Sequence, residues 1–262
     1  MDLLLQLADV YTLDTLYSPT QLPRDSLLRQ ALSVSAITLA GGAFLYLSGS
    51  RLLVRVHVRQ VATRSPRFLK QQERKEIAYA LGSIPGMTLL MLPWFLAEVR
   101  GYSMLYSHVS DFGWGYLVFS AVWFLVFTDM LIYWFHRWLH HPRVYAAVHK
   151  PHHKWIVPTP FASHAFHPLD GFIRGLPYHL FAMLFPIHRV LFLALFATVN
   201  YWTISIHDGL HVSKNAWLNG AAHHAMHHSD FNYNYGQYFT LWDRLDGSYR
   251  EPQHEPEREK QE

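Results

Sequence analysis

The sequence predicts an all-α integral membrane protein with a helical cap, rich in histidine, on one side of the membrane. Half of the 262 residues are hydrophobic and only 16% are charged. The apolar residues are gathered into long runs, as in membrane proteins, while the charged residues and histidines occupy the connections. The chain also holds 19 histidines and no cysteine. These two features predict membrane-spanning helices with a polar, histidine-rich site beside them.

Three runs are expected to cross the membrane, at residues 31–49, 77–97 and 112–135. The first two carry no charge, and each approaches the roughly 20 residues that a helix needs to cross a bilayer. The third contains one acid, Asp129, and aromatic residues at both ends, where the headgroup region favours them. Residues 172–206 are interrupted by Pro177, Pro186, His188 and Arg189, which predicts two short apolar segments. About four transmembrane helices are therefore expected, the last pair forming a short hairpin.

The chain is expected to form a single membrane-embedded domain over residues 1–250. Residues 251–262 are charged and lack an apolar period, which predicts a disordered tail. The opening MDLLLQLADV has an acid where a signal peptide has basic residues, so no cleavable signal peptide is expected.

The charges of the loops predict the orientation. Residues 51–76 contain eight basic and two acidic residues, whereas Arg100 is the only basic residue between the second and third runs. The positive-inside rule places loop 51–76 in the cytosol. Counting the crossings onward then puts every histidine-rich segment on the cytosolic side.

The histidines occur at spacings that bring imidazoles together. Residues three or four apart share a face of a helix, and pairs of this kind recur in two distant blocks of the chain. Ten clustered imidazoles are a poor packing choice but a good set of metal ligands. The candidate ligands are His136, His140, His149, His152, His153, His207, His211, His224, His227 and His228.

Ten imidazoles are too many for one ion and suit two. Neutral imidazole binds zinc, copper, iron or nickel, so the residues alone leave the metal open. Structural zinc usually recruits cysteine, which this chain lacks. Asp170, Asp208 and Asp129 are candidates for carboxylates that accept hydrogen bonds from the ligand rings and orient them.

At this point the residues resemble a known family. HRWLH, HKPHH and HHAMHH resemble the three histidine boxes of the membrane fatty acid hydroxylase and sterol desaturase superfamily. Longer strings are similar to the C-5 sterol desaturase (lathosterol oxidase) family, and the similarity extends over nearly the whole chain. These strings are HKPHHKWIVPTPFASHAFHPLDGF, SIHDG, NGAAHHAMHH, FNYNYGQYFTLWDRLDGSYR and the opening MDLLLQLADVYTLDTLYSP.

The resemblance implies a membrane oxidase that introduces the C5–C6 double bond into a Δ7-sterol of the lathosterol or episterol type. It implies two iron ions, O2 as co-substrate, and electrons that come from NAD(P)H through cytochrome b5 and its reductase. The implied location is the endoplasmic reticulum membrane, with the metal site facing the cytosol. The implied partners are the sterol, cytochrome b5 and the lipid bilayer, and no nucleic acid is expected.

The resemblance also suggests further residues of the site. His164 and His167 lie in the family-specific stretch without ligand spacing, and we expect them beside the ligands or in the substrate pocket, or in structural roles. Arg137, Lys150 and Lys154 are candidates for docking an acidic electron donor, although positive-inside charge alone also accounts for them. The candidates for the sterol lining are aromatic residues, for which simple packing or an interface belt is the commoner role. They are Trp134, Phe135, Trp155, Phe161 and Phe166.

Two alternatives remain open at this stage. A lipid hydroxylase or a sterol C-4 methyl oxidase of the same superfamily would use the same histidines. A membrane metal transporter would instead place ionisable ligands within the spans, along a path. The histidines of this chain are expected at span ends and in cytosolic segments, which disfavours transport.

Overall fold

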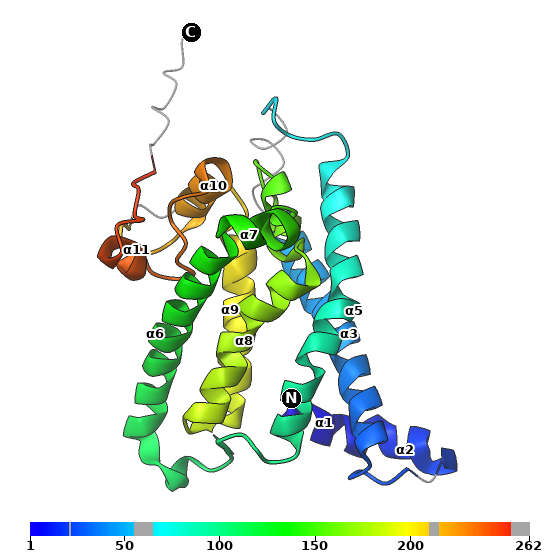
Figure 1. The fold of residues 1–262 in the computed structure, drawn as a ribbon. Helices are drawn as coiled ribbons and strands as arrows, with labels where there is room; N and C mark the ends of the chain where they lie inside the picture. Colours follow the sequence, from blue (N-terminus) through cyan, green and yellow to red (C-terminus); the bar gives the residue numbers. More distant parts are fainter. Residues whose placement is uncertain (21, 55–64, 210–214, 253–262) are drawn as a thin grey trace.

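Three long helices form the membrane-crossing part of the molecule (Figure 1). The computed structural model describes residues 1–20, 22–54, 65–209 and 215–252; His211 and residues 253–262 of the expected tail lie outside these ranges. Each of the three helices is long and apolar enough to cross a bilayer, and they cover the three expected runs. The prediction of an all-α multi-pass membrane protein is therefore confirmed. The helices are α3 (Leu27–Leu53), α5 (Gln72–Val99) and α6 (Gly113–Leu139).

Local sequence signals set the ends of these helices. The Ser26 hydroxyl accepts a hydrogen bond from the backbone N–H of Arg29 at 3.5 Å and caps the start of α3. Gly101 follows α5 with a φ of 80°, a left-handed conformation that commonly ends a helix and that glycine adopts without strain. Pro85 and Pro93 lie inside α5, as membrane helices tolerate.

The apolar stretch at 172–206 forms two short antiparallel helices, α8 (Pro168–Leu184) and α9 (Arg189–Ser205). The break falls at residues 185–188, whereas Pro177 lies within α8 and does not interrupt it. At 17 residues each, these helices are about 26 Å long. Their crossing of the bilayer as a fourth spanning unit stays a prediction.

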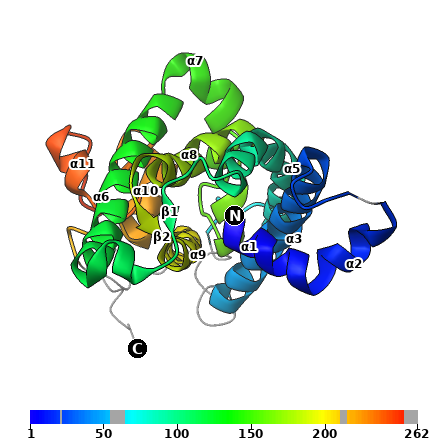
Figure 2. The same ribbon diagram turned by 90° about the horizontal axis from the view of Figure 1, so that it is seen from below.

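The turn between α8 and α9 is fastened to the linker between α5 and α6. Strands β1 (Leu105–Tyr106) and β2 (Ile187–His188) pair in parallel, with Leu105 opposite Ile187. In Figure 2, which views the molecule from below, this pair lies between α6 and α9. The hairpin therefore reaches the level at which α5 ends and α6 begins.

An aromatic core joins α6 to the hairpin. The Phe124 ring contacts Phe181 of α8 at 5.2 Å and Phe192 of α9 at 6.1 Å between centroids. All three rings are buried. This core holds the three helices that lead into the histidine-rich end.

Short elements gather at the end of the bundle opposite the N-terminus (Figure 1). They include α7 (Pro142–Val144), α10 (Ala221–Asp230), α11 (Leu241–Leu245), a π-helical turn at Tyr145–His149 and 3₁₀ turns at His152–Lys154 and Pro160–His164. A further 3₁₀ turn, Val109–Asp111, lies in the linker before α6.

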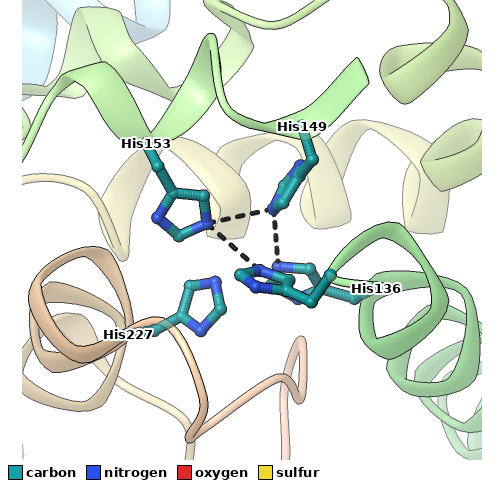
Figure 3. A group of neighbouring side chains, drawn as sticks. His136, His149, His153 and His227 are labelled. Carbon is teal, nitrogen blue, oxygen red and sulfur yellow. Dashed lines mark hydrogen bonds between the residues drawn. The ribbon is translucent and has the colours of Figure 1, made fainter. Parts of the chain in front are cut away.

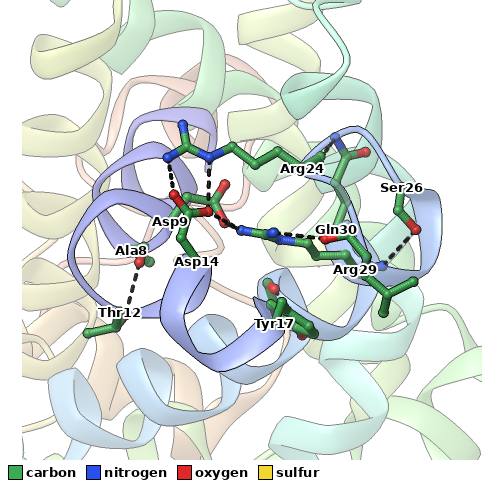
Figure 4. Close-up of polar contacts among 11 residues, drawn as sticks. Ala8, Asp9, Thr12, Asp14, Tyr17, Arg24, Ser26, Arg29 and Gln30 are labelled. Carbon is green, nitrogen blue, oxygen red and sulfur yellow. Dashed lines mark hydrogen bonds and ion pairs between the residues drawn. The ribbon is translucent and has the colours of Figure 1, made fainter. Parts of the chain in front are cut away.

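The N-terminal residues form a helix that lies across the other ends of α3 and α5. It comprises α1 (Asp2–Ala8), a π-helical turn (Asp9–Leu13), α2 (Asp14–Tyr17) and a 3₁₀ turn (Ser18–Thr20). Asp9 points inward and accepts from Arg29 at 2.7 Å, and Arg29 also donates to the partly exposed Asp14 at 2.5 Å (Figure 4). Val10 and Tyr11 are 60% and 78% exposed. A helix with polar contacts inward and apolar residues outward suits the membrane interface rather than water.

Candidate metal centre

Nine of the ten candidate histidines lie together in two adjacent groups. We call His136, His140, His149, His153 and His227 site A, and His152, His207, His224 and His228 site B. Within each group one nitrogen from every ring lies within 4.8 Å of the others. Figure 3 shows four of the site A rings converging on a common point. The tenth candidate, His211, lies outside the described residues.

Local helix geometry accounts for part of this arrangement. His136 is in the last turn of α6 and His140 caps it, so the four-residue spacing places both rings on one side, with centroids 5.2 Å apart. In α10 the same spacing directs His224 and His228 to site B, while His227 faces site A.

The second histidine box does not form the single helical turn that its HxxHH spacing predicts. A π-helical turn ends at His149, Pro151 follows, and a separate 3₁₀ turn begins at His152. As a result His149 and His153 belong to site A while His152 belongs to site B. This box therefore joins the two sites.

Hydrogen bonds fix the protonation of four ligand rings. The Nδ1 atom of His136 lies 2.8 Å from the Tyr235 carbonyl, and that of His149 lies 2.6 Å from Asp170. His207 and His227 make the same contact, each at 2.7 Å, with the carbonyls of Thr203 and Tyr233. Carbonyl and carboxylate oxygens only accept, so each Nδ1 carries the proton and each Nε2 carries a lone pair.

The lone pairs then face one another. The Nε2 atoms of His136 and His149 are 3.2 Å apart, although both must be unprotonated when both Nδ1 atoms donate. Two facing lone pairs repel unless a cation lies between them. Among the described residues, the buried Nε2 of His227 and both ring nitrogens of His152 also have no hydrogen-bond partner. Buried nitrogens without partners are costly in a protein core but are what a metal requires. The donor set fits two transition-metal ions.

Burial keeps the rings in the form that binds metal. Desolvation disfavours the charged imidazolium, and neighbouring rings add to the effect. Burial lowers the pKa of His207 from 6.5 to about 3. It also holds the pKa well below the usual value for His152, His153, His224, His227 and His228. The ligands are therefore neutral at physiological pH.

Asp170 lies where the sequence predicts an orienting carboxylate. It is fully buried, and its Oδ2 accepts from His149 while its Oδ1 accepts from Arg174 Nε at 3.1 Å. Sequence reasoning missed Arg174, although a lone charge in an apolar membrane segment is itself a signal of function. The side chains of Asp170 and Arg174 are one turn apart on α8, so the pair is built into one helix.

Asp129 acts on a loop rather than on a ring, which corrects its expected role. Its Oδ1 accepts from the backbone N–H groups of Gln237 and Tyr238 at 3.1 and 2.7 Å. Asp243, which the sequence did not single out, accepts from the N–H of Tyr235 at 2.8 Å. These two buried acids hold the loop whose carbonyls orient His136 and His227. Asp208 is buried beside His207 in the chain.

His164 and His167 take different places. His164 contacts Ser163 Oγ at 3.0 Å and Asn200 of α9 at 3.3 Å. His167 caps the start of α8, where its Nδ1 accepts from the N–H of Leu169 at 3.2 Å. Its role is therefore structural. His223, which is adjacent to the ligand His224 in the chain, is also buried.

The aromatic residues that are candidates for the sterol lining also lie in different surroundings. The Phe166 ring lies 5.6 Å from that of His152 and is the one that reaches the ligands. Trp155 and Phe161 are buried in a core with Tyr46, so packing accounts for them. Trp134 is 48% exposed on α6 and faces outward, which corrects its assignment to a lining. The remaining candidate, Phe135, is half-buried on α6.

Comparisons with known proteins identify the family of this part of the chain. The fatty acid hydroxylase family model matches residues 121–248, the part of the chain that carries all nine described ligands. No solved structure matches the chain significantly.

Curated relatives match over almost the full length. The chain is 51% identical over 253 residues to a delta(7)-sterol 5(6)-desaturase of Schizosaccharomyces pombe, covering 96% of this chain and 84% of the relative. It is 48% identical over 257 residues to the lathosterol oxidase of Mus musculus, covering 96% and 86%. A delta(7)-sterol 5(6)-desaturase of Eremothecium gossypii is 53% identical over 236 residues, covering 89% and 67%. The chain therefore belongs to the family of the delta(7)-sterol 5(6)-desaturases and lathosterol oxidases.

Proposed function

We propose that the protein is a membrane di-iron oxidase that introduces the C5–C6 double bond into a Δ7-sterol. The observation that carries this proposal is the pair of all-histidine sites at one end of the membrane helices, in a chain whose relatives bear the names of C5 desaturases. Iron in particular rests on family membership, because imidazole also accepts other metals.

The reaction requires a redox metal and an external electron source. Two hydrogens leave C5 and C6 of the sterol, a donor supplies two electrons, the solvent supplies two protons, and O2 is reduced to two molecules of water. Bound iron supplies the O2 activation that side chains alone do not provide. The protein contributes ligand orientation, substrate placement and exclusion of competing reactions.

The chain's own residues support these roles. The acceptors on Nδ1 of His136, His149, His207 and His227 aim the Nε2 lone pairs inward. Asp170, itself paired with Arg174, accepts the Nδ1 proton of His149 and so orients that ligand. Phe166 gives site B an apolar neighbour, which suits a hydrocarbon ring. A sterol dissolved in the bilayer would approach laterally, between the helices.

The proposed location is the endoplasmic reticulum membrane, with both sites on the cytosolic side. The eight basic residues of loop 51–76 support this orientation through the positive-inside rule. The proposed electron donor is cytochrome b5, which NAD(P)H reduces through a reductase.

The segment that carries the second histidine box presents a basic surface to such a donor. No acid occurs from residue 130 to residue 169. Arg143, Lys150 and Lys154 are exposed in this segment and form no ion pair with the residues that the structure describes. Arg137, by contrast, pairs with Asp246. An acidic donor would gain long-range attraction here.

Reversing these charges is expected to weaken donor recognition. The double substitution Lys150→Glu and Lys154→Glu should raise the KM for cytochrome b5 on the order of tenfold at low salt. The KM for the sterol should change little. The matched control is Lys75→Glu, which alters an exposed residue of α5. Steady-state kinetics with purified donor measures the effect; an equal rise in the control would contradict donor docking at this surface.

Expression in cells that lack their own C5 desaturase tests the proposed function. We expect 5,7-diene sterols to reappear at the expense of Δ7-sterols when sterols are profiled by mass spectrometry. Hydroxylated lipids or C-4-oxidised sterols in their place would identify a hydroxylase or a C-4 methyl oxidase. Metal flux in proteoliposomes without O2-dependent turnover would indicate a transporter.

A further inference from the structure

Residues 157–166, which include the 3₁₀ turn Pro160–His164, are packed against the first two spanning helices and against α9. We call this stretch the inserted segment. It follows the second histidine box, contains Pro158 and Pro160, and is largely buried. Backbone carbonyls that are not in a helix need partners from the protein when they lie near the membrane interior. The side chains that supply these partners therefore decide where the segment lies.

Helix α3 supplies two hydroxyl groups. The Tyr46 hydroxyl donates to the Phe161 carbonyl at 2.9 Å, and the Ser50 hydroxyl donates to the Pro160 carbonyl at 3.2 Å. Both side chains are buried. Spaced four residues apart, they face the inserted segment from the same side of α3.

Helix α5 supplies a second row of polar groups. Gln72 donates to the Val157 carbonyl at 2.8 Å and to Glu76 Oε1 at 2.7 Å. The other carboxylate oxygen of Glu76 accepts from the Thr159 hydroxyl. Ser83 donates to the Phe166 carbonyl at 2.5 Å. Gln72, Glu76 and Ser83 recur at helical spacing along one buried stripe.

Glu76 is the centre of this row. Its side chain is completely buried and in contact with both Gln72 and Thr159. A buried carboxylate is costly unless donors satisfy it. Here Gln72 and Thr159 both donate to it, so the carboxylate fixes the position of the inserted segment.

The inserted segment is coupled to site B through Phe166. The Phe166 ring lies 5.6 Å from the His152 ring, and its carbonyl is held by Ser83. Among the described residues, no hydrogen-bond partner orients either ring nitrogen of His152. In site A, by contrast, hydrogen bonds to Asp170 and Tyr235 hold His149 and His136. His152 is thus the ligand that depends most on packing.

We propose that Glu76, acting with Thr159 and Ser83, is a positioning residue that holds the inserted segment in place and thereby sets His152 for metal binding in site B. This proposal rests on the metal centre of the proposed function and adds a difference between the ligands. Hydrogen bonds to carbonyl or carboxylate oxygens hold His136, His149 and His227 in site A and His207 in site B, whereas His152 depends on its contact with the inserted segment.

Metal titration of the purified full chain in lipid nanodiscs tests the proposal without relying on turnover. Co²⁺ is the probe, because its visible absorption reports on ligand geometry and its stoichiometry counts the sites. The parent protein is expected to bind two ions. In Glu76→Ala and Thr159→Val, one ion should bind as in the parent, and the second should bind at least tenfold more weakly with an altered spectrum. Thr159→Ser, which keeps the hydroxyl, should restore both properties.

Two further variants keep the test decisive. Ser83→Ala removes a single hydrogen bond and should weaken the second ion if the larger changes prevent folding. Glu73→Gln alters a carboxylate of the same helix outside the buried stripe and should bind as the parent does. Parent-like binding in Glu76→Ala, Thr159→Val and Ser83→Ala, or equal weakening of both ions in a folded variant, would overturn the proposal. A parent that binds no Co²⁺ would overturn the metal centre itself.

Discussion

Replacing His152 by alanine is expected to abolish the formation of 5,7-diene sterols while leaving the protein folded in the membrane. The ring contributes one of the four nitrogens that the described residues bring together in site B. Losing a partner outside the ligand set already costs 10–100-fold in metal affinity or activity, so loss of a ligand should reduce turnover by more than about 100-fold. Sterol profiling in cells without their own C5 desaturase measures the effect.

His141→Ala is the matched control for this prediction. His141 belongs to the same histidine-rich stretch but is exposed, and its ring only caps the short helix α7. The control should retain near-parental diene formation at equal expression. Substantial diene formation by the His152 variant would show that site B does not need this ligand.

The Asp170→Asn substitution is expected to weaken metal retention and stability together. An amide oxygen still accepts a hydrogen bond from His149, but it carries no charge to stabilise the ligand. The neighbouring Arg174, whose side chain is 11% exposed, would lose its counter-ion. Breaking a buried pair costs about 3–5 kcal/mol, and loss of a group that orients a ligand costs about 10–100-fold in metal affinity. Chelator competition and thermal unfolding measure the two effects.

Asp230→Asn controls for the loss of an acid. Asp230 pairs with Arg250 at 2.9 Å, where both side chains are substantially exposed. Surface pairs contribute about 0–1 kcal/mol, so this variant should resemble the parent in both measurements. Equal metal retention in the Asp170 and Asp230 variants would exclude a role for Asp170 in orienting His149.

The membrane helices were predictable because long uncharged runs permit few other structures. The start of α5 could not be predicted in the same way. The uncharged run begins at residue 77, whereas the helix begins at Gln72. The missing turn contains Glu73, Arg74, Lys75 and Glu76, which hydropathy assigns to a loop. Only contacts with the distant inserted segment explain why Gln72 and Glu76 are buried.

The histidines that form the metal centre could be predicted from the sequence, but their division between site A and site B could not. Helical spacing correctly pairs His136 with His140 and His224 with His228. It fails between His149 and His152, where Pro151 separates two different kinds of turn. The carbonyl groups that orient His136 and His227 carry no sequence signature, since every residue has one. Asp170 could be suggested from sequence because a carboxylate is a distinctive side chain.

The pairing of β1 with β2 limits how the helices can move. Beyond the two strands, Tyr116 donates to the Pro186 carbonyl at 3.0 Å, and His188 contacts the Ser107 carbonyl at 2.9 Å. These bonds join the α8–α9 turn to both the linker and the first turn of α6. These links lie at the end of α6 farthest from His136, so the α8–α9 turn and the start of α6 are held together as one unit at that end.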